Sequence, residues 1–460
     1  MIKENCGIVG VYNVKDVPKI LYFLLFSLQH RGQESCGIIF SDFKNTYIYK
    51  GMGLVSDVFS KFDFEKYKDS GFGIGHVRYS TTGSPDIKNI QPFIVEYKGK
   101  KYGIAHNGTL VNSYTLREEL ESEGTLFQTT LDTEIIMHLI FKSKKQNFID
   151  KLIDALEKIK GAYSLLIFSP NGIYAIKDPN GFRPLCLGKF GDGYIVASES
   201  CAFDLIGANY IREIEEGEIL HIGENGLKSY YLPKNKISRC IFEFIYFARP
   251  DSKIFGKSVY IARKKLGENL AKEISFKVDL VVPVPDSGNI AAIGLAEKLK
   301  IPFEMGFIRN HYVGRTFIMP FQISREIGVK LKLNPVKEII KNKSIIVVED
   351  SIVRGTTSTL RINELRKAGA KNVYMAVSSP PIKYPCFYGI DFPTKDELIA
   401  SNKTIEEIKE IIGLDGLHYL SLKGMLFSMD LPEDEFCTAC FTGEYPVEII
   451  DFKGKEQFER

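Results

Sequence analysis

The feature that most constrains the fold of this chain is a change in hydrophobic pattern near residues 233–239. Before this point, short segments of alternating apolar and polar residues are separated by Gly and Asn, and amphipathic helices are predicted over 18–31 and 132–148. After it, helical stretches alternate with strands that are apolar throughout, such as "SIIVVE" (344–349). Continuous apolar strands are expected where helices cover both faces of a sheet. The sequence therefore predicts packed antiparallel sheets in the first half and a parallel α/β sheet in the second.

Composition limits the classes of protein to which this chain can belong. Its 460 residues suffice for two or three domains, and 60 basic against 57 acidic side chains give no general attraction to nucleic acid or to a membrane surface. The longest apolar run, 20–28, is far shorter than the roughly 20 residues of a membrane helix. Eight cysteines without a recognisable export signal indicate a reducing compartment, so we expect a cytoplasmic protein. Three of these cysteines lie in apolar segments and are expected in the core: Cys36, Cys186 and Cys201.

The stretch "VVEDSIVRGTTS" (347–358) predicts a phosphate site in the second half. A buried strand delivers Glu349 and Asp350 at its carboxyl end, where parallel sheets bind ligands. Gly355 and three hydroxyl residues then lead into a helix, whose N-terminus favours an anion. Carboxylates at this place suit ribose hydroxyls or Mg²⁺. An ordinary strand–turn–helix with capping hydroxyls and a solvated acidic pair remains the alternative at this point.

The order of these residues resembles the phosphoribosylpyrophosphate (PRPP) motif of type I phosphoribosyltransferases. The resemblance implies that Glu349 and Asp350 address the ribose hydroxyls and one Mg²⁺, although Glu349 stands where Asp is commoner. It also implies that the 5′-phosphate is held by a loop whose members are Arg354, Gly355, Thr356, Thr357 and Ser358. "VPVPDSG" (282–288) resembles the pyrophosphate loop, which makes Ser287 a metal or pyrophosphate contact. Residues 309–332, with Arg309 and Arg315, resemble a cationic lid over the pyrophosphate.

Cys6, only five residues into the sequence, is a candidate nucleophile. A thiol is a weak nucleophile at neutral pH unless a base accepts its proton. If residues 1–5 were removed, Cys6 would carry a free α-amine, whose ordinary pKa of about 7.7–8.0 lies within about one unit of that of a thiol. In the uncut chain the same nitrogen is an amide without basicity. The chemistry therefore favours cleavage before Cys6 and a propeptide over residues 1–5.

Three further motifs follow Cys6 in the first half. "AHNGTL" predicts a tight turn in which the Asn107 amide and the Gly108 N–H form an oxyanion hole. Arg78 ends a strand and suits a carboxylate, and Asp132 begins a helix. Singly, each has an ordinary structural explanation. Together they resemble the glutamine amidotransferases of the N-terminal-nucleophile class, in which Arg78 with Thr81 would hold the α-carboxylate of glutamine and Asp132 its α-amine.

The chain as a whole is identified as a member of the amidophosphoribosyltransferase family, which joins this glutaminase to a PRPP-binding domain. The family resemblance implies a propeptide at 1–5, an α+β glutaminase domain with stacked antiparallel sheets between helices at 6–232, and an α/β type I phosphoribosyltransferase domain at 233–460. The implied reaction converts PRPP and glutamine to 5-phosphoribosylamine, glutamate and pyrophosphate, the first committed step of purine synthesis. We hypothesise that ammonia passes between the two sites by a path ordered when PRPP closes the lid. Feedback inhibition by purine nucleotides and a homotetramer or homodimer are family expectations.

Four cysteines remain to be explained: Cys240, Cys386, Cys437 and Cys440. From the residues alone, tetrahedral Zn²⁺, an iron–sulfur cluster and plain core cysteines are all open. One branch of the amidotransferase family carries a [4Fe–4S] cluster at positions that match all four, and this resemblance favours one cluster per subunit.

Two rival functions can be weighed against this one. Glucosamine-6-phosphate synthase shares the first domain but lacks the PRPP loop. A PRPP-sensing regulatory protein with a vestigial glutaminase would keep the loop, but intact Cys6, Arg78, Asn107 and Asp132 argue against it. A glutamine hydrolysis assay separates the enzyme from the regulator.

Overall fold

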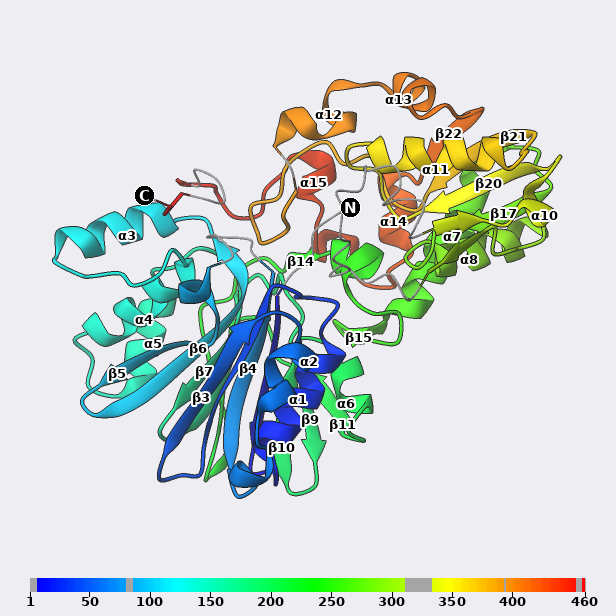
Figure 1. The fold of residues 1–460 in the computed structure, drawn as a ribbon. Helices are drawn as coiled ribbons and strands as arrows, with labels where there is room; N and C mark the ends of the chain where they lie inside the picture. The colour runs from blue at the N-terminus through cyan, green and yellow to red at the C-terminus, as the bar shows by residue number, and fades with distance from the viewer. Residues whose placement is uncertain (1–5, 80–85, 311–332, 393, 452–456, 460) are drawn as a thin grey trace.

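The computed structural model describes residues 6–79, 86–310, 333–392, 394–451 and 457–459. Two halves lie side by side (Figure 1): a stack of two large sheets with helices outside them, and a smaller sheet set among helices. The proposed propeptide, Thr81, Arg315 and most of the predicted lid fall outside the described residues. The change of hydrophobic pattern in the sequence thus corresponds to a change of architecture.

The first half contains one sheet of seven strands, in the order β11-β9-β10-β1-β4-β2-β3, and one of six, in the order β13-β12-β8-β7-β6-β5. All neighbouring strands in both sheets are antiparallel. The first sheet comprises β1 Gly7–Tyr12, β2 Ser35–Ser41, β3 Thr46–Met52, β4 Phe72–Arg78, β9 Cys186–Phe190, β10 Gly193–Ala197 and β11 Asn209–Glu213. The second comprises β5 Phe93–Tyr97, β6 Lys100–Leu110, β7 Gly161–Ser169, β8 Gly172–Lys177, β12 Glu218–Gly223 and β13 Gly226–Tyr231.

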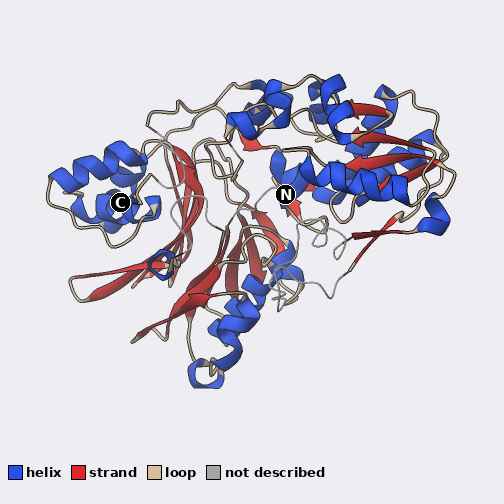
Figure 2. Ribbon diagram, turned by 45° about the horizontal axis from the view of Figure 1, so that its top comes forward, coloured by secondary structure: helices blue, strands red, loops and turns tan. Residues whose placement is uncertain are grey.

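The two sheets pack face to face through a core that joins Ile8 and Ile74 of the first sheet to Ala105 and Leu166 of the second. Helices cover the outer faces (Figure 2), with α1 over the first sheet and α4 and α5 over the second. The helices of this half are α1 Val17–Ser27, α2 Val55–Val58, α3 Ser113–Ser122, α4 Asp132–Lys142, α5 Phe148–Leu156 and α6 Cys201–Asp204. Both predicted helix extents were wrong. Helix α1 ends at Ser27, before Arg31, whose side chain forms hydrogen bonds with buried acids. The predicted helix over 132–148 ends at Lys142, where a polar run begins at Ser143, and a separate helix starts at Phe148.

The second half contains a four-stranded parallel sheet in the order β17-β20-β21-β22. Alternate residues of β20 face two different cores: Ile346 and Val348 pack with α7 and α8, whereas Ile345 and Val347 pack with α11 and α13. This two-sided burial explains why the strand is apolar throughout. The sheet strands are β17 Leu280–Pro283, β20 Ser344–Glu349, β21 Asn372–Val377 and β22 Gly416–Tyr419.

The remaining elements of the second half are shorter and lie around this sheet. The helices are α7 Val259–Glu273, α8 Asn289–Leu299, α10 Lys337–Ile340, α11 Thr356–Lys367, α12 Ile399–Asn402, α13 Ile405–Ile412, α14 Leu422–Phe427 and α15 Ala439–Thr442. The paired short strands are β14 Arg239–Cys240 with β23 Phe436–Cys437, β15 Lys253–Ile254 with β16 Lys257–Ser258, and β18 Phe307–Arg309 with β19 Leu333–Pro335. Within the described residues, no helix has the length and apolar character needed to cross a membrane.

A buried ionic network joins the two halves. Arg31 donates to Glu199 at 2.5 Å and to both carboxylate oxygens of Glu243 at 2.8 and 3.0 Å. Arg183 donates to Glu243 at 3.1 Å and to the Tyr388 carbonyl at 2.7 Å. All four charged side chains are at most 1% exposed. Removing one partner would leave a buried charge uncompensated, so the network couples the stability of the two halves.

Candidate active sites

Cys6 immediately precedes β1 and is 6% exposed. Gly7 pairs with Val77, so Cys6 lies opposite Arg78 at the end of the β1–β4 ladder. Its Sγ donates to the Tyr79 carbonyl at 3.4 Å, and its own carbonyl accepts from Arg31 Nε at 3.1 Å. Burial raises the pKa of the thiol, against the opposing effects of that hydrogen bond and of the Arg78 guanidinium. A thiol in this position needs a nearby base to become a nucleophile.

The structure brings most of the predicted glutamine residues to one pocket. The residues lining it are Cys6, Arg78, Tyr79, Gln91, His106, Gly108, Leu131 and Asp132. They come from the ends of β1 and β4 in one sheet, from β6 in the other and from the start of α4. The pocket therefore forms where the ends of the two sheets meet.

Asn107 and Gly108 do not form the tight turn that the sequence predicted. They lie within β6 and pair with Ser164 and Tyr163 of β7. A Cβ at Gly108 would lie 2.0 Å from the Ala162 carbonyl oxygen, and its φ is +150°, so only glycine fits. The dipeptide "NG" suggested a hairpin turn. A glycine that is required because a neighbouring strand packs closely against it looks the same in the sequence as a glycine that is required by a turn. Among the described residues, the buried Asn107 Nδ2 has no hydrogen-bond partner.

Arg78 and Asp132 both lie where the sequence placed them, at the end of a strand and at the start of a helix. Arg78 is 2% exposed, and its guanidinium lies 3.9 Å from Glu34. Burial lowers the pKa of Arg78, opposed by its acidic neighbours. Asp132 Oδ2 accepts from the Leu110 N–H at 3.0 Å, which ties α4 to the end of β6. The pocket therefore presents one cation and one anion, a pattern suited to an amino acid zwitterion.

The sequence reading missed His106, although it stands beside Asn107 in the quoted motif. Its Nδ1 lies 3.1 Å from Thr133 Oγ1 and 3.6 Å from Asp132 Oδ1, and its carbonyl lies 3.1 Å from His76 Nε2. His76 belongs to β4, so this last contact joins the two sheets directly beside the pocket. The only signal in the sequence was a histidine next to a candidate catalytic residue. The ionic partners of Arg31 were also missed, because they are distant in sequence.

The second half brings Glu349, Asp350 and Ser287 together at the carboxyl ends of β17 and β20. Ser287 Oγ donates to Asp350 Oδ2 at 2.5 Å, and Ser351 Oγ donates to Asp350 Oδ1 at 2.5 Å. Arg361 of α11 pairs with Glu349 at 2.5 Å. Burial raises the pKa of Glu349 to about 8, with Arg361 opposing the shift and Asp350 adding to it. Both acids are 5% exposed, which excludes the alternative of a solvated acidic pair.

Gly355 caps α11 with a left-handed backbone, φ +75°. A Cβ there would lie 2.8 Å from Ile399 Cδ1, so the loop needs glycine for both conformation and space. The hydroxyl residues that follow form the first turn of α11, from exposed Thr356 to buried Ser358. The unpaired N–H groups of such a turn suit a phosphate.

Two predicted PRPP contacts have other partners in this structure. Arg309, at the end of β18, forms an ion pair with Asp286. Arg354 lies 3.0 Å from Glu397, and both side chains are about half exposed. Their roles towards PRPP stay predictions.

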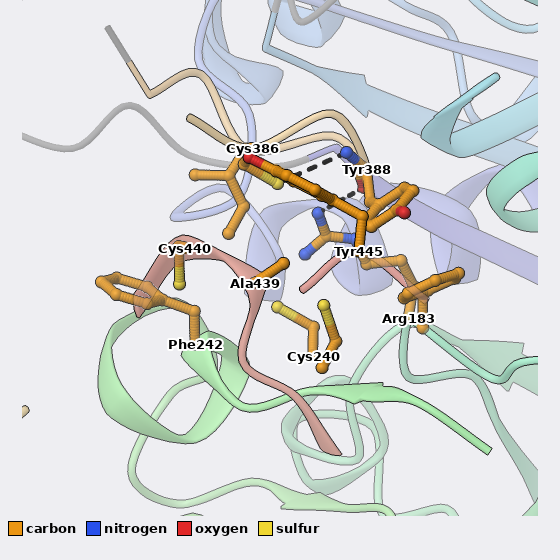
Figure 3. A pocket seen from close by; sticks show the side chains of 11 residues that line it. Arg183, Cys240, Phe242, Cys386, Tyr388, Ala439, Cys440 and Tyr445 are labelled. Carbon is orange, nitrogen blue, oxygen red and sulfur yellow. Dashed lines mark hydrogen bonds between the residues drawn. The ribbon is translucent and has the colours of Figure 1, made fainter. Parts of the chain in front are cut away.

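The four unexplained cysteines line one cavity together with Arg183 and Tyr388 (Figure 3). They come from β14, from the 386–390 segment and from the β23–α15 turn. Burial raises the pKa of each thiol, and Arg183 opposes the shift at Cys240 and Cys386. The three cysteines assigned to the core, Cys36, Cys186 and Cys201, are buried at 0%, 1% and 3% exposure, as predicted. Among the described residues, no three His, Cys, Asp or Glu side chains lie close enough to hold a single metal ion.

The fold and the two sites together define a glutamine amidotransferase joined to a phosphoribosyltransferase. A family model described as a glutamine amidotransferase domain matches residues 76–204. The chain is 48% identical over 456 residues to chloroplastic amidophosphoribosyltransferase 1 of Arabidopsis thaliana, covering 98% of this chain and 80% of that protein. It is 47% identical to the amidophosphoribosyltransferase of Bacillus subtilis, covering 97% and 95%.

Solved structures agree with the sequence relatives. The glutamine PRPP amidotransferase of B. subtilis, complexed with ADP and GMP, superposes with a TM-score of 0.91 at 46% identity, covering 97% of this chain and 98% of that one. The chain belongs to the amidophosphoribosyltransferase family. It is therefore an enzyme that moves the amide nitrogen of glutamine to PRPP and releases 5-phosphoribosylamine, glutamate and pyrophosphate, the first committed step of purine synthesis. The alternative of a regulatory protein with a vestigial glutaminase receives no support.

Proposed function

We propose that Cys6 is the nucleophile of the glutaminase half, after removal of residues 1–5. The convergence of Cys6, Arg78, Gly108 and Asp132 on one pocket is the observation that carries this proposal. The thiol proton passes to the new α-amine, and Sγ attacks the side-chain amide carbon of glutamine. The α-ammonium returns this proton to the amide nitrogen, so the tetrahedral intermediate collapses to a thioester and releases neutral ammonia. Water then hydrolyses the thioester to glutamate and restores the thiol.

Asn107 and Gly108 are proposed to stabilise the oxyanion of that intermediate. The Asn107 Nδ2 is a buried donor without a partner among the described residues, and such a donor is costly to bury unless a ligand uses it. Held in β6, it needs little reorganisation when charge develops on the substrate oxygen.

Arg78 is proposed to hold the α-carboxylate of glutamine and Asp132 its α-amine. A guanidinium fork binds a carboxylate through two parallel hydrogen bonds. Asp132 Oδ2 already accepts a hydrogen bond from the Leu110 N–H, and Oδ1 can accept one from the α-ammonium of glutamine. The prediction that Thr81 helps Arg78 to hold the α-carboxylate is part of this proposal. Residues 6–232 would then form the glutaminase domain and 233–460 the phosphoribosyltransferase domain.

We propose that Glu349 and Asp350 bind the ribose hydroxyls of PRPP and, with Ser287, one Mg²⁺. The direct contact between Ser287 and Asp350 fits this set, because Mg²⁺ takes oxygen ligands and commonly binds through one or two carboxylates plus substrate phosphates. When bound, Mg²⁺ neutralises charge on the departing pyrophosphate. Gly355 to Ser358 would hold the 5′-phosphate at the start of α11, and Arg309, Arg315 and Arg354 would contribute cations.

The four-cysteine cavity is proposed to hold one [4Fe–4S] cluster through Cys240, Cys386, Cys437 and Cys440. A single zinc ion would need all four sulfurs about 2.3 Å from one point. A four-iron cluster is larger, and each thiolate binds a different iron. This fits four thiols that line one cavity but do not lie close enough together to bind a single metal ion. Arg183 favours the thiolate forms that such ligands require. The cluster would connect the β14–β23 pair to the 386–390 segment.

Purine nucleotides are proposed as inhibitors of this enzyme. The support is the B. subtilis relative, whose solved structure holds ADP and GMP. Cytoplasmic location and assembly as a homotetramer or homodimer stay predictions from the sequence.

One comparison of variants tests the proposed nucleophile. Cys6→Ala is expected to abolish glutamine-dependent synthesis of phosphoribosylamine while synthesis from high free ammonia continues, because ammonia bypasses the thiol. Cys36→Ala, a buried cysteine outside the pocket, is the matched control and should retain both activities. Intact mass should show that residues 1–5 are absent from active enzyme. Full glutamine-dependent activity in Cys6→Ala, or in protein that retains Met1, would overturn the proposal.

A further inference from the structure

The chain that follows the four-cysteine cavity returns to the glutaminase half. Tyr445 donates to the Pro385 carbonyl at 2.8 Å, and Val447 exchanges two hydrogen bonds with the Tyr388 hydroxyl at 2.5 and 3.0 Å. Further on, the Asp451 N–H donates to the Val111 carbonyl at 3.3 Å, just before α3. Figure 1 shows this last, red segment reaching α3. Residues 440–451 thus lie along the boundary between the halves.

Residues 457–459, which we name the clasp, are anchored on α3. Phe458 is 5% exposed and belongs to the same core cluster as Leu116 and Leu120 of that helix. The Arg117 guanidinium contacts two aromatic rings, 4.2 Å from the Phe127 centroid and 4.7 Å from that of Phe458. Such cation–π contacts stabilise most where water is excluded. The clasp is therefore a packed element of the glutaminase core.

The clasp also holds the loop that leads into Asp132. Arg117, stacked on Phe458, donates to the Thr129 carbonyl at 3.1 Å. Glu459 accepts a hydrogen bond from the Thr130 hydroxyl at 2.8 Å. Leu131 and Asp132, the next two residues, line the glutamine pocket. Phe458 thus holds Thr129 indirectly, through Arg117, and Glu459 holds Thr130 directly. Both residues belong to the loop immediately before the pocket.

We propose that the clasp is a positioning element for glutamine: Phe458 and Glu459 fix the 129–132 loop so that Asp132 meets the α-amine of the substrate. The inference rests on the proposed role of Asp132 in glutamine binding. Neither clasp residue touches the reacting atoms, and ammonia does not use this loop. Loosening the clasp should therefore weaken glutamine binding and leave the ammonia reaction unchanged.

The experiment compares steady-state kinetics of full-length variants with glutamine and with ammonia. Glu459→Ala removes the acceptor of the Thr130 hydroxyl, and loss of one hydrogen bond of this kind predicts a KM for glutamine about three- to tenfold higher. Phe458→Ala is expected to raise it by about tenfold or more, because it removes ring packing as well as the Arg117 contact. Phe458→Tyr, which keeps the ring, should recover most of the lost affinity. Ammonia-dependent kcat should stay within about twofold of the parent, because the reaction with free ammonia does not use the 129–132 loop.

Matched controls come from the same region and from the other half. Glu448→Gln changes an acid in the segment before the clasp, and Phe427→Ala changes an exposed ring of α14; neither should alter the KM for glutamine. An unchanged KM in both clasp variants would overturn the inference, as would an equal fall of both activities in a variant whose circular dichroism matches that of the parent. If Phe458→Ala does not fold, Glu459→Ala decides the matter. Cys6→Ala separates this result from the proposed function, because it tests the nucleophile whatever the clasp does.

Discussion

The glutamine pocket and the PRPP site hold their polar groups in opposite ways. In the first half, Asn107, next in sequence to Gly108 of the glutamine pocket, keeps a buried donor without a partner among the described residues and lies within a strand. At the PRPP site, Asp350 accepts hydroxyl hydrogen bonds on both oxygens, and Glu349 is paired with Arg361. On the proposed roles, the first site would be preorganised for a developing negative charge, whereas the acids of the second would exchange internal partners for ligand. The comparison teaches that the two halves of one chain hold their polar groups differently: in the described residues, one keeps a buried donor unpaired and the other pairs its acids internally.

The largest expected effect concerns the buried ionic network that joins the two halves. Glu243→Gln should lower the free energy of unfolding by about 3–5 kcal/mol, because the buried guanidinium groups of Arg31 and Arg183 lose the carboxylate charge that they share. Glu397→Gln, at the exposed pair with Arg354, is the matched control and should cost less than about 1 kcal/mol. Chemical denaturation followed by circular dichroism measures both. Equal effects would mean that the ionic network does not fix the halves.

The next prediction concerns the preorganised donor. Asn107→Ala should lower kcat for glutamine by about 10²–10³-fold with little change in KM, because the donor is used mainly in the transition state. Ammonia-dependent synthesis should not change. A rise in KM at constant kcat would instead assign Asn107 to ground-state binding, and the contrast with the PRPP site would weaken.

A smaller effect concerns pH and the contact between the two sheets. Burial lowers the pKa of His76 to about 3, opposed by its hydrogen bond to the His106 carbonyl and assisted by Arg78. The unfolded chain takes up a proton below about pH 6.5 while the native state does not, so stability is lost as pH falls through this range. The slope is at most about 1.4 kcal/mol per pH unit, or about 2 kcal/mol between pH 6.5 and 5. His76→Asn should flatten this slope in denaturation curves recorded at several pH values; an unaltered slope would show that His76 does not contribute.

The smallest effect probes the second site. Gly355→Ala places a Cβ in a left-handed conformation against Ile399, which predicts a loss of about 1–2 kcal/mol and a higher KM for PRPP. Gly413→Ala is the matched control, because Gly413 has a similar φ of +83° but no atom within 4 Å of the added Cβ. The temperature of thermal unfolding should fall in both variants and fall further in Gly355→Ala, which adds a clash with Ile399 to the strained backbone, whereas only Gly355→Ala should alter PRPP kinetics. If glutamine hydrolysis measured without PRPP fell in Gly355→Ala, the two sites would not be independent.

Local sequence predicted the local structure of the second site well and the packing around the first site poorly. The strand–loop–helix around Glu349, Asp350 and Gly355 could be predicted because strand, loop and helix are contiguous. The turn predicted at Asn107 and Gly108 was wrong because the demand for glycine comes from Ala162 of the neighbouring strand. His106 was missed for a related reason, since its contacts to Thr133 and Asp132 lie 26 or more residues away.

By itself, the sequence determined the two architectures and the candidates for the nucleophile and the phosphate loop, because periodicity and contiguous motifs are local properties. Only the tertiary structure decided which buried groups meet: the network from Arg31 to Arg183, the cavity shared by four cysteines from three separate segments, and the clasp at Phe458 and Glu459. The physical reason is that a contact between distant residues depends on how sheets and helices pack, and no short stretch of sequence encodes that packing.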